Sequence, residues 1–76
     1  MEIGDTVFVE KASVNSMVYY SEHKKEFKCP CQWHNLRGVI TRFHGNYAHV
    51  HELGNPENKS AFFLRDLTPI KSEAET

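Results

Sequence analysis

The chain has 76 residues, enough for one small domain, and nine Lys and Arg side chains nearly balance ten Asp and Glu. This balance disfavours a dedicated nucleic-acid-binding protein, which typically carries a basic excess. No apolar run approaches the roughly 18 residues that a membrane-spanning helix needs, and the first five residues lack the basic and apolar segments of a signal peptide. We therefore expect a cytoplasmic protein with no nucleic-acid partner and no membrane insertion.

Residues 6–10 are predicted to form the first strand. Gly4 and Asp5 are typical turn residues, and the Thr-Val-Phe-Val-Glu run after them is rich in β-branched and aromatic side chains. Since side chains alternate along a strand, Val7 and Val9 should share one face of it. That face is the first candidate for the core.

Residues 11–35 are predicted to form one long excursion with hairpin character. The segment 13–20 contains a short apolar patch compatible with a brief strand, the segment 21–28 is polar, and Pro30 interrupts any helix or central strand. No helical period runs longer than a turn or two. A loop of this length in a compact domain is usually functional.

The remaining residues alternate between turn signals and short apolar runs. Strands are predicted at 36–43, 47–53, 60–64 and 68–70. The pattern predicts an all-β fold, a small five-stranded Src-homology-3-like barrel over residues 1–70 with one long loop after the first strand, and a polar tail at 71–76. The expected core is Val7, Val9, Val39 or Ile40, Ala48, Val50, Phe62 or Phe63, Leu67 and Ile70.

The two cysteines are the sharpest chemical feature. Thiolate and imidazole groups bind zinc and the iron atoms of iron–sulfur clusters. The candidate metal ligands are therefore Cys29, Cys31, His34 and His23. Zinc sites usually leave two or more residues between cysteines and add a second ligand pair at a distance. Here His23, His44, His49 and His51 could supply the missing ligands only if folding brings them together. The spacing favours two reduced thiols in a surface loop, because a disulfide that skips one residue is strained and no secretory signal is present.

Catalysis has one candidate dyad, a cysteine of this pair with His34. No signal of a substrate cleft or of a Gly-rich phosphate loop accompanies it, so we expect no catalytic residues, no cofactor in this chain and no enzyme activity by itself. His49 and His51 share a strand face and could bind metal or respond to pH, although such a pair is more often the polar side of a half-exposed strand. A small zinc-binding module built on Cys29, Cys31 and histidines is the alternative function.

The long excursion is also dense in aromatic residues. Tyr and Trp are favoured anchors of protein interfaces, and charged residues typically form the rim around them. The segment 17–34 is therefore predicted to be the main docking element, although some of its aromatic residues could instead cap the core. The predicted partner-binding residues are Tyr19, Tyr20, His23, Lys24 and Trp33.

The sequence resembles the variable subunit of ferredoxin–thioredoxin reductase, a family of cyanobacteria and chloroplasts. The resemblance covers most of residues 1–70 in four pieces. They are the opening strand with its Gly-Asp, the Val-Tyr-Tyr to Phe loop, a Gly-x-Val strand and the Lys-x-x-Phe closing strand with its Asp-Leu ending, at residues 1–9, 18–27, 36–40 and 59–67. The loop piece is the specific one. Cys-Pro-Cys and the short turn at 44–46 depart from the family pattern.

The resemblance implies a protein-binding role in a redox complex. A variable subunit is a small barrel that forms a heterodimer with a catalytic subunit, and this partner carries the iron–sulfur cluster and the redox-active disulfide. The variable subunit holds no cofactor, works in the cyanobacterial cytoplasm or the chloroplast stroma, and stabilises the cluster region of its partner. Another barrel accessory subunit of a photosynthetic electron-transfer complex remains an alternative.

Overall fold

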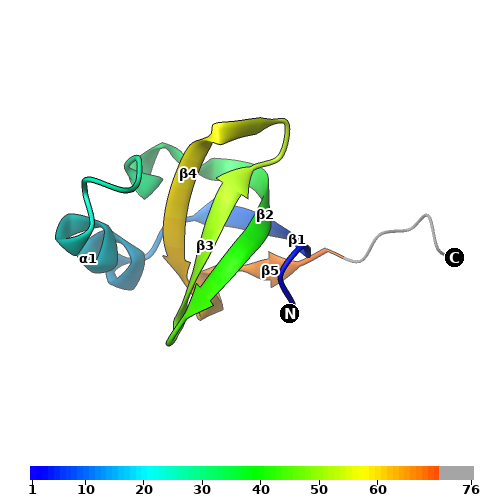
Figure 1. The fold of residues 1–76 in the computed structure, drawn as a ribbon, viewed down its shortest axis with the longest axis horizontal. Helices are drawn as coiled ribbons and strands as arrows, with labels where there is room; N and C mark the ends of the chain where they lie inside the picture. Colours follow the sequence, from blue (N-terminus) through cyan, green and yellow to red (C-terminus); the bar gives the residue numbers. More distant parts are fainter. Residues whose placement is uncertain (71–76) are drawn as a thin grey trace, which may run out of the picture.

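Alternating apolar residues produce the main element of the structure, a five-stranded antiparallel sheet with strand order β4-β3-β2-β1-β5 (Figure 1). The computed structural model describes residues 1–70, so the predicted tail at 71–76 lies outside the described residues. The strands are β1 Thr6–Lys11, β2 His34–His44, β3 Tyr47–Glu52, β4 Asn55–Phe63 and β5 Thr68–Pro69. The predicted mostly β fold with five strands is confirmed.

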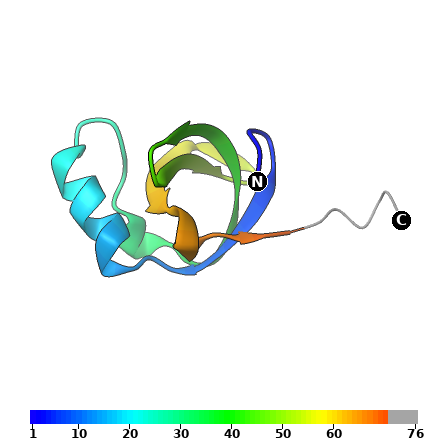
Figure 2. The same ribbon diagram turned by 90° about the horizontal axis from the view of Figure 1, so that it is seen from below.

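The sheet is strongly curved and open. The long strand β2 pairs with β1 through its first half and with β3 through its second half, and a register shift between Ile40 and Arg42 bends it. Seen from below, the sheet curls around the core while the helix lies outside it (Figure 2). Within residues 1–70, β4 and β5 are the two edges, so the sheet is not a closed barrel.

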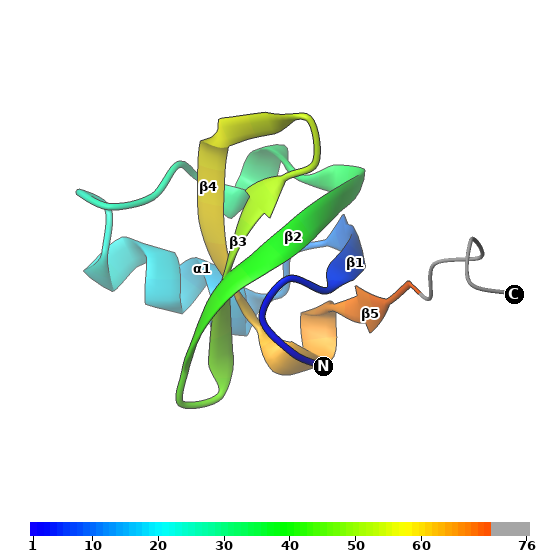
Figure 3. The ribbon, with the colours of Figure 1, turned by 45° about the vertical axis from the view of Figure 1, so that its right-hand side comes forward.

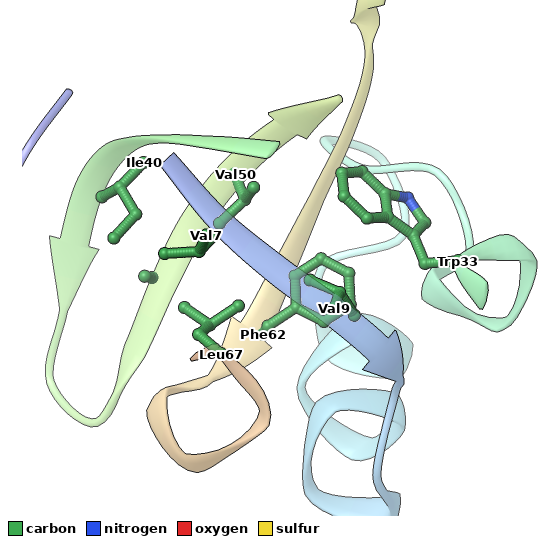
Figure 4. Close-up of a cluster of buried hydrophobic side chains, with 8 residues drawn as sticks. Val7, Val9, Trp33, Ile40, Val50, Phe62 and Leu67 are labelled. Atoms are coloured by element: carbon green, nitrogen blue, oxygen red, sulfur yellow. The ribbon is translucent and has the colours of Figure 1, made fainter. Parts of the chain in front are cut away.

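The concave face of the sheet holds the core. The fully or almost fully buried cluster consists of Val7, Val9, Trp33, Ile40, Ala48, Val50, Phe62 and Leu67. Figure 4 shows the labelled side chains of this cluster pointing toward one another. Most of these residues were correctly predicted to be in the core from the alternation of side chains along β1 and β3. Ile70, expected in the core, is only half-buried. Trp33 was not expected there.

The long excursion contains a helix, which corrects the prediction for this segment. Helix α1 spans Val14–Glu22, nine residues or about two and a half turns, where the sequence indicated a loop and a brief strand. A single 3₁₀ turn, η1, follows at Pro30–Gln32, and a second, η2, lies at Leu64–Asp66. Helix α1 packs against β4 at one side of the sheet, as seen in Figures 1 and 3.

Gly38 fixes how closely the core can pack. It lies in β2, is buried, and pairs with Val7 on one side and Glu52 on the other. A Cβ atom at this position would overlap Cγ1 of Val50 and would lie 2.8 Å from the carbonyl oxygen of His51 and 3.1 Å from Trp33. Only glycine therefore allows Trp33 to rest on β2.

The edge strand β4 begins earlier than expected. The sequence predicted a turn over 54–58, whereas the strand starts at Asn55 and includes Pro56. A proline is tolerated here because an edge strand has no neighbour on one side to receive its missing N–H. Next to the middle of β4, the backbone N–H of Lys28 donates to the carbonyl of Lys59 at 2.8 Å, so part of this edge is covered.

Candidate docking face

Helix α1 is attached to the sheet by polar residues on its inner side. The N–H and the hydroxyl of Ser13, the residue before the helix, donate to Oδ2 of Asp66 at 3.0 and 2.7 Å. The hydroxyl of Ser16 also donates to this oxygen, and it accepts the backbone N–H of Phe63 at 2.8 Å. Ser16 is fully buried. These hydrogen bonds attach the start of the helix to the end of β4 and to η2.

The outer side of the same helix carries apolar residues. Val14 and Val18 are one turn apart, so they lie on one face, and their side chains are 77% and 51% exposed. A single exposed valine is ordinary on a protein surface. The helix buries Ser16 and Tyr19 on its inner side, and the two valines add an apolar pair on its outer side. This exposed pair marks the outer face of α1 as a candidate contact surface.

Beyond α1, aromatic and histidine side chains gather between the helix and the outer face of the sheet. We call them the aromatic–histidine cluster, and Tyr19 is its centre. The ring of Tyr19 stacks on His23 at 4.2 Å and on Tyr47 at 4.3 Å between ring centroids. The other members surround these three rings edge-on or tilted: Phe27, His44 and His49.

Hydrogen bonds fix the orientation of these rings. The Nδ1–H of His23 donates to the carbonyl oxygen of Tyr19 at 2.9 Å, since a carbonyl can only accept. The hydroxyl of Tyr19 lies 3.2 Å from Nδ1 of His44 and 3.5 Å from Nε2 of His49. It can donate to one ring and accept from an N–H of the other. Tyr19 thereby connects α1 to both strands of the β2–β3 hairpin.

Burial shifts the titration of two members of this cluster. Removal from water lowers the pKa of His49, and the nearby positive charge of Arg42 and the ring of His44 lower it further, while Glu26 opposes them. Removal from water also raises the pKa of the Tyr19 hydroxyl, with a smaller contribution from Glu26. Both shifts favour the neutral side chains, and neutral rings pack best against one another.

An open groove runs along the cluster. It has a volume of about 470 Å³ and lies between the helix and the turn that joins β2 to β3. Val18, Glu22 and His23 form its helical wall, and the hairpin residues His44 and Tyr47 face them. The exposed valine and the aromatic rings are therefore parts of one continuous surface, which we call the docking face.

The predicted partner-binding residues separate into three groups. Lys24 is exposed, Tyr20 is half-buried, and His23 is half-buried and lines the groove of the docking face. Tyr19 is 7% exposed and acts as the connection between helix and hairpin. Trp33 has no exposed area, so the expectation that it anchors a partner is corrected: it fills the end of the core beside Phe62, at a centroid distance of 5.0 Å.

The four candidate metal ligands do not form one metal site. The structure joins Cys29 and Cys31 in a disulfide, which corrects the expectation of reduced thiols. Their Cα atoms are 5.2 Å apart, within the range that a disulfide bridges. Within residues 1–70, no group of three or more His, Cys, Asp or Glu side chains is arranged to hold a metal ion. His34 is exposed, and His23 belongs to the aromatic–histidine cluster.

Five residues of the docking face were not predicted from the sequence to contact a partner, although His49 was considered, with His51, as a metal-binding or pH-responsive pair. They are Val14, Val18, His44, Tyr47 and His49. Val14 and Val18 have the spacing of a helical face, which was the available signal. His44 and Tyr47 meet Tyr19 only after the hairpin and the helix have packed together.

Comparison with known proteins gave no relatives. No family model, no curated protein and no solved structure matches the chain. In addition, no helix in the described part of the chain is both long and apolar enough to cross a membrane.

Proposed function

We propose that the chain is a non-catalytic subunit that binds a protein partner through the docking face, and that this partner is the catalytic subunit of a ferredoxin–thioredoxin reductase-like redox complex. The observation that carries the docking role is the outward-facing pair Val14 and Val18, two exposed apolar side chains one turn apart on a helix whose start is held by hydrogen bonds to Asp66. Burying exposed apolar side chains is the main favourable contribution to association. The nature of the partner rests on the sequence resemblance alone.

Several features of the docking face suit a protein partner. Its apolar side chain Val18 lies beside the charged residue Glu22 in the same groove, and this combination of apolar and charged groups suits a protein interface. The hydrogen bonds to Asp66 hold α1 in place before any partner arrives. A surface organised in advance loses less conformational entropy on binding.

Binding of the purified catalytic subunit of a ferredoxin–thioredoxin reductase tests this proposal, with isothermal titration calorimetry as the readout. Replacement of an interface valine by glutamate buries an unpaired charge, so V18E should weaken binding by about 2 kcal/mol, roughly 30-fold. Because Val18 is exposed in the free chain, the free energy of unfolding of V18E should be within about 0.5 kcal/mol of that of the wild type.

Leu53 supplies the matched control. It is 51% exposed, as Val18 is, and it lies in the turn between β3 and β4, away from helix α1 (Figure 1). L53E should bind like the wild type. If the wild type does not bind the catalytic subunit, the assignment to this redox complex is wrong. If the wild type binds and V18E binds equally well, the docking face is wrong while the partner stands.

A further inference from the structure

The Cys29–Cys31 disulfide lies at the surface. Cys31 is exposed, Cys29 is half-buried, and Pro30 between them is fully buried. A disulfide sulfur reacts with an external thiolate only where the thiolate can approach it. Cys31 is the more exposed of the two residues, so its sulfur is the one that an external thiolate should reach more easily.

The fold around this disulfide is held by other interactions. A disulfide stabilises a fold mainly in proportion to the loop that it closes, and this one closes a loop with a single intervening residue. Before it, Lys28 is held to β4 by its N–H bond to Lys59 and by the Ser60 hydroxyl, which donates to the Lys28 carbonyl at 2.7 Å. After it, the N–H of Trp33 donates to the carbonyl of Pro30 at 2.9 Å.

The sulfur of Cys29 is the better leaving group. The backbone N–H of Cys31 points at this sulfur at 3.3 Å and donates a weak hydrogen bond to it. Such a donor stabilises a thiolate more than it stabilises a sulfur of a disulfide, because the thiolate carries the full negative charge. Attack at Cys31 would thus release a sulfur that the backbone is already placed to stabilise.

A small apolar pocket lies beside the exposed sulfur. It has a volume of about 310 Å³ and is lined by Cys31, by the apolar side chains of Ala12, Met17 and Trp33, and by Lys11 and His34 at its rim. The Nε1 of Trp33 is buried and has no hydrogen-bond partner among the described residues. The pocket could receive an apolar side chain next to an attacking cysteine, while Lys11 attracts the negative thiolate.

We propose that Cys29 and Cys31 form a redox-active pair that undergoes thiol–disulfide exchange with a dithiol protein in the folded state. One thiolate of the dithiol attacks Sγ of Cys31, so that a mixed disulfide forms, the Cys29–Cys31 bond breaks and Cys29 leaves as a thiolate. The second thiolate of the dithiol protein then attacks the first sulfur of the same protein, which is bonded to Cys31 in the mixed disulfide. This attack forms the disulfide of the dithiol protein and releases Cys31 as a thiolate. Two electrons pass to this chain, both cysteines take up protons from water, and the dithiol protein ends as a disulfide.

Trp33 provides a direct readout, because it is the only tryptophan of the chain and lines the same pocket as Cys31. A disulfide quenches the fluorescence of a neighbouring indole, so reduction by a thioredoxin-type dithiol protein should raise Trp33 emission while far-ultraviolet circular dichroism stays unchanged. The reduction rate should not change in urea below the unfolding transition. A rate that rises in step with the unfolded population would show a structural disulfide and overturn the proposal.

The roles of the two cysteines are tested with 5,5′-dithiobis(2-nitrobenzoate) on the reduced protein. In the wild type, the adduct on Cys31 should be displaced by Cys29, which leaves an adduct-free disulfide. C29S should retain a stable adduct on Cys31. This adduct should form faster than the adduct on Cys29 in C31S, because Cys31 is exposed and Cys29 is half-buried. Stable adducts on both cysteines of the wild type, or equal rates in the two variants, would contradict the assignment.

A comparison with glutathione, a small monothiol, tests whether the preferred reductant is a dithiol protein. At equal thiol concentration glutathione should reduce the pair at least about tenfold more slowly, since it lacks the second thiol that completes the exchange within one complex. Equal rates would overturn the preference for a dithiol protein. If V18E no longer binds the partner but its Cys29–Cys31 disulfide is reduced at the wild-type rate, the redox role does not depend on the proposed docking function.

Discussion

Ser16 and Asp66 are 50 positions apart in the sequence and are joined by a hydrogen bond from the serine hydroxyl to the carboxylate. The same carboxylate oxygen accepts the N–H and the hydroxyl of Ser13. One acidic side chain in η2 therefore fixes the start of helix α1, and with it the orientation of the whole docking face.

Replacement of Ser16 by alanine should destabilise the fold by about 1–3 kcal/mol, because it leaves the Phe63 N–H without its acceptor and removes one bond from Asp66. Urea denaturation measures this free energy. Ser21, whose exposed hydroxyl donates only to the Val18 carbonyl of the same helix, gives the control S21A. Equal stability of S16A and S21A would contradict the role of Ser16.

Replacement of Gly38 by alanine should destabilise the fold by about 1–3 kcal/mol through overpacking. The added methyl group meets Val50 and also the backbone carbonyl of His51. The side chain can be shortened, but the carbonyl belongs to the β2–β3 ladder and cannot move far. The double variant with V50A should therefore not restore stability in thermal melts. Full recovery there would mean that Val50 alone limits the packing.

Replacement of Trp33 by alanine should lower the free energy of unfolding by roughly 3–5 kcal/mol, as expected for a fully buried aromatic residue. Lys24, another predicted anchor, is exposed, and K24A should remain within about 0.5 kcal/mol of the wild type. Chemical denaturation of the isolated chain compares the two. If W33A is as stable as the wild type, Trp33 does not stabilise the core and is again a candidate partner contact.

Stability should fall in mild acid because of His49. Its pKa is lowered in the folded chain from the ordinary value of 6.5, so the unfolded chain takes up the proton more readily. The contribution of His49 is fully present above about pH 6.5 and is lost as the pH falls through its folded pKa. Urea denaturation gives the free energy of unfolding at about pH 7.5 and about pH 5.5, and the difference between these two values should be smaller for H49Q than for the wild type. H34Q, at an exposed position, should retain the wild-type difference.

The strands were predictable because their burial follows local alternation. Ala48 and Val50 face the core and His49 faces outward, as two-residue periodicity requires. Helix α1 was hidden because its inward positions are Ser16 and Tyr19 while Val14 and Val18 point outward. A helix attached by hydrogen bonds to Asp66, far away in the sequence, leaves no apolar period to detect.

The docking face depended on tertiary structure in the same way. Tyr19 was selected for its residue type, but His44 and His49 come from a hairpin that reaches it only when α1 folds back on β4. The disulfide also escaped prediction, since bridging one residue requires the backbone bend that Pro30 and η1 supply. Spacing alone cannot show such a bend.

Both edge strands of the sheet contain a proline, Pro56 in β4 and Pro69 in β5. A proline offers no N–H to an incoming strand, and the exposed charges of Glu57 and Lys59 further discourage pairing along β4. These features disfavour extension of the sheet by a foreign strand and so work against fibrillar self-association. We therefore expect recognition by this chain to use side chains more than a shared backbone ladder.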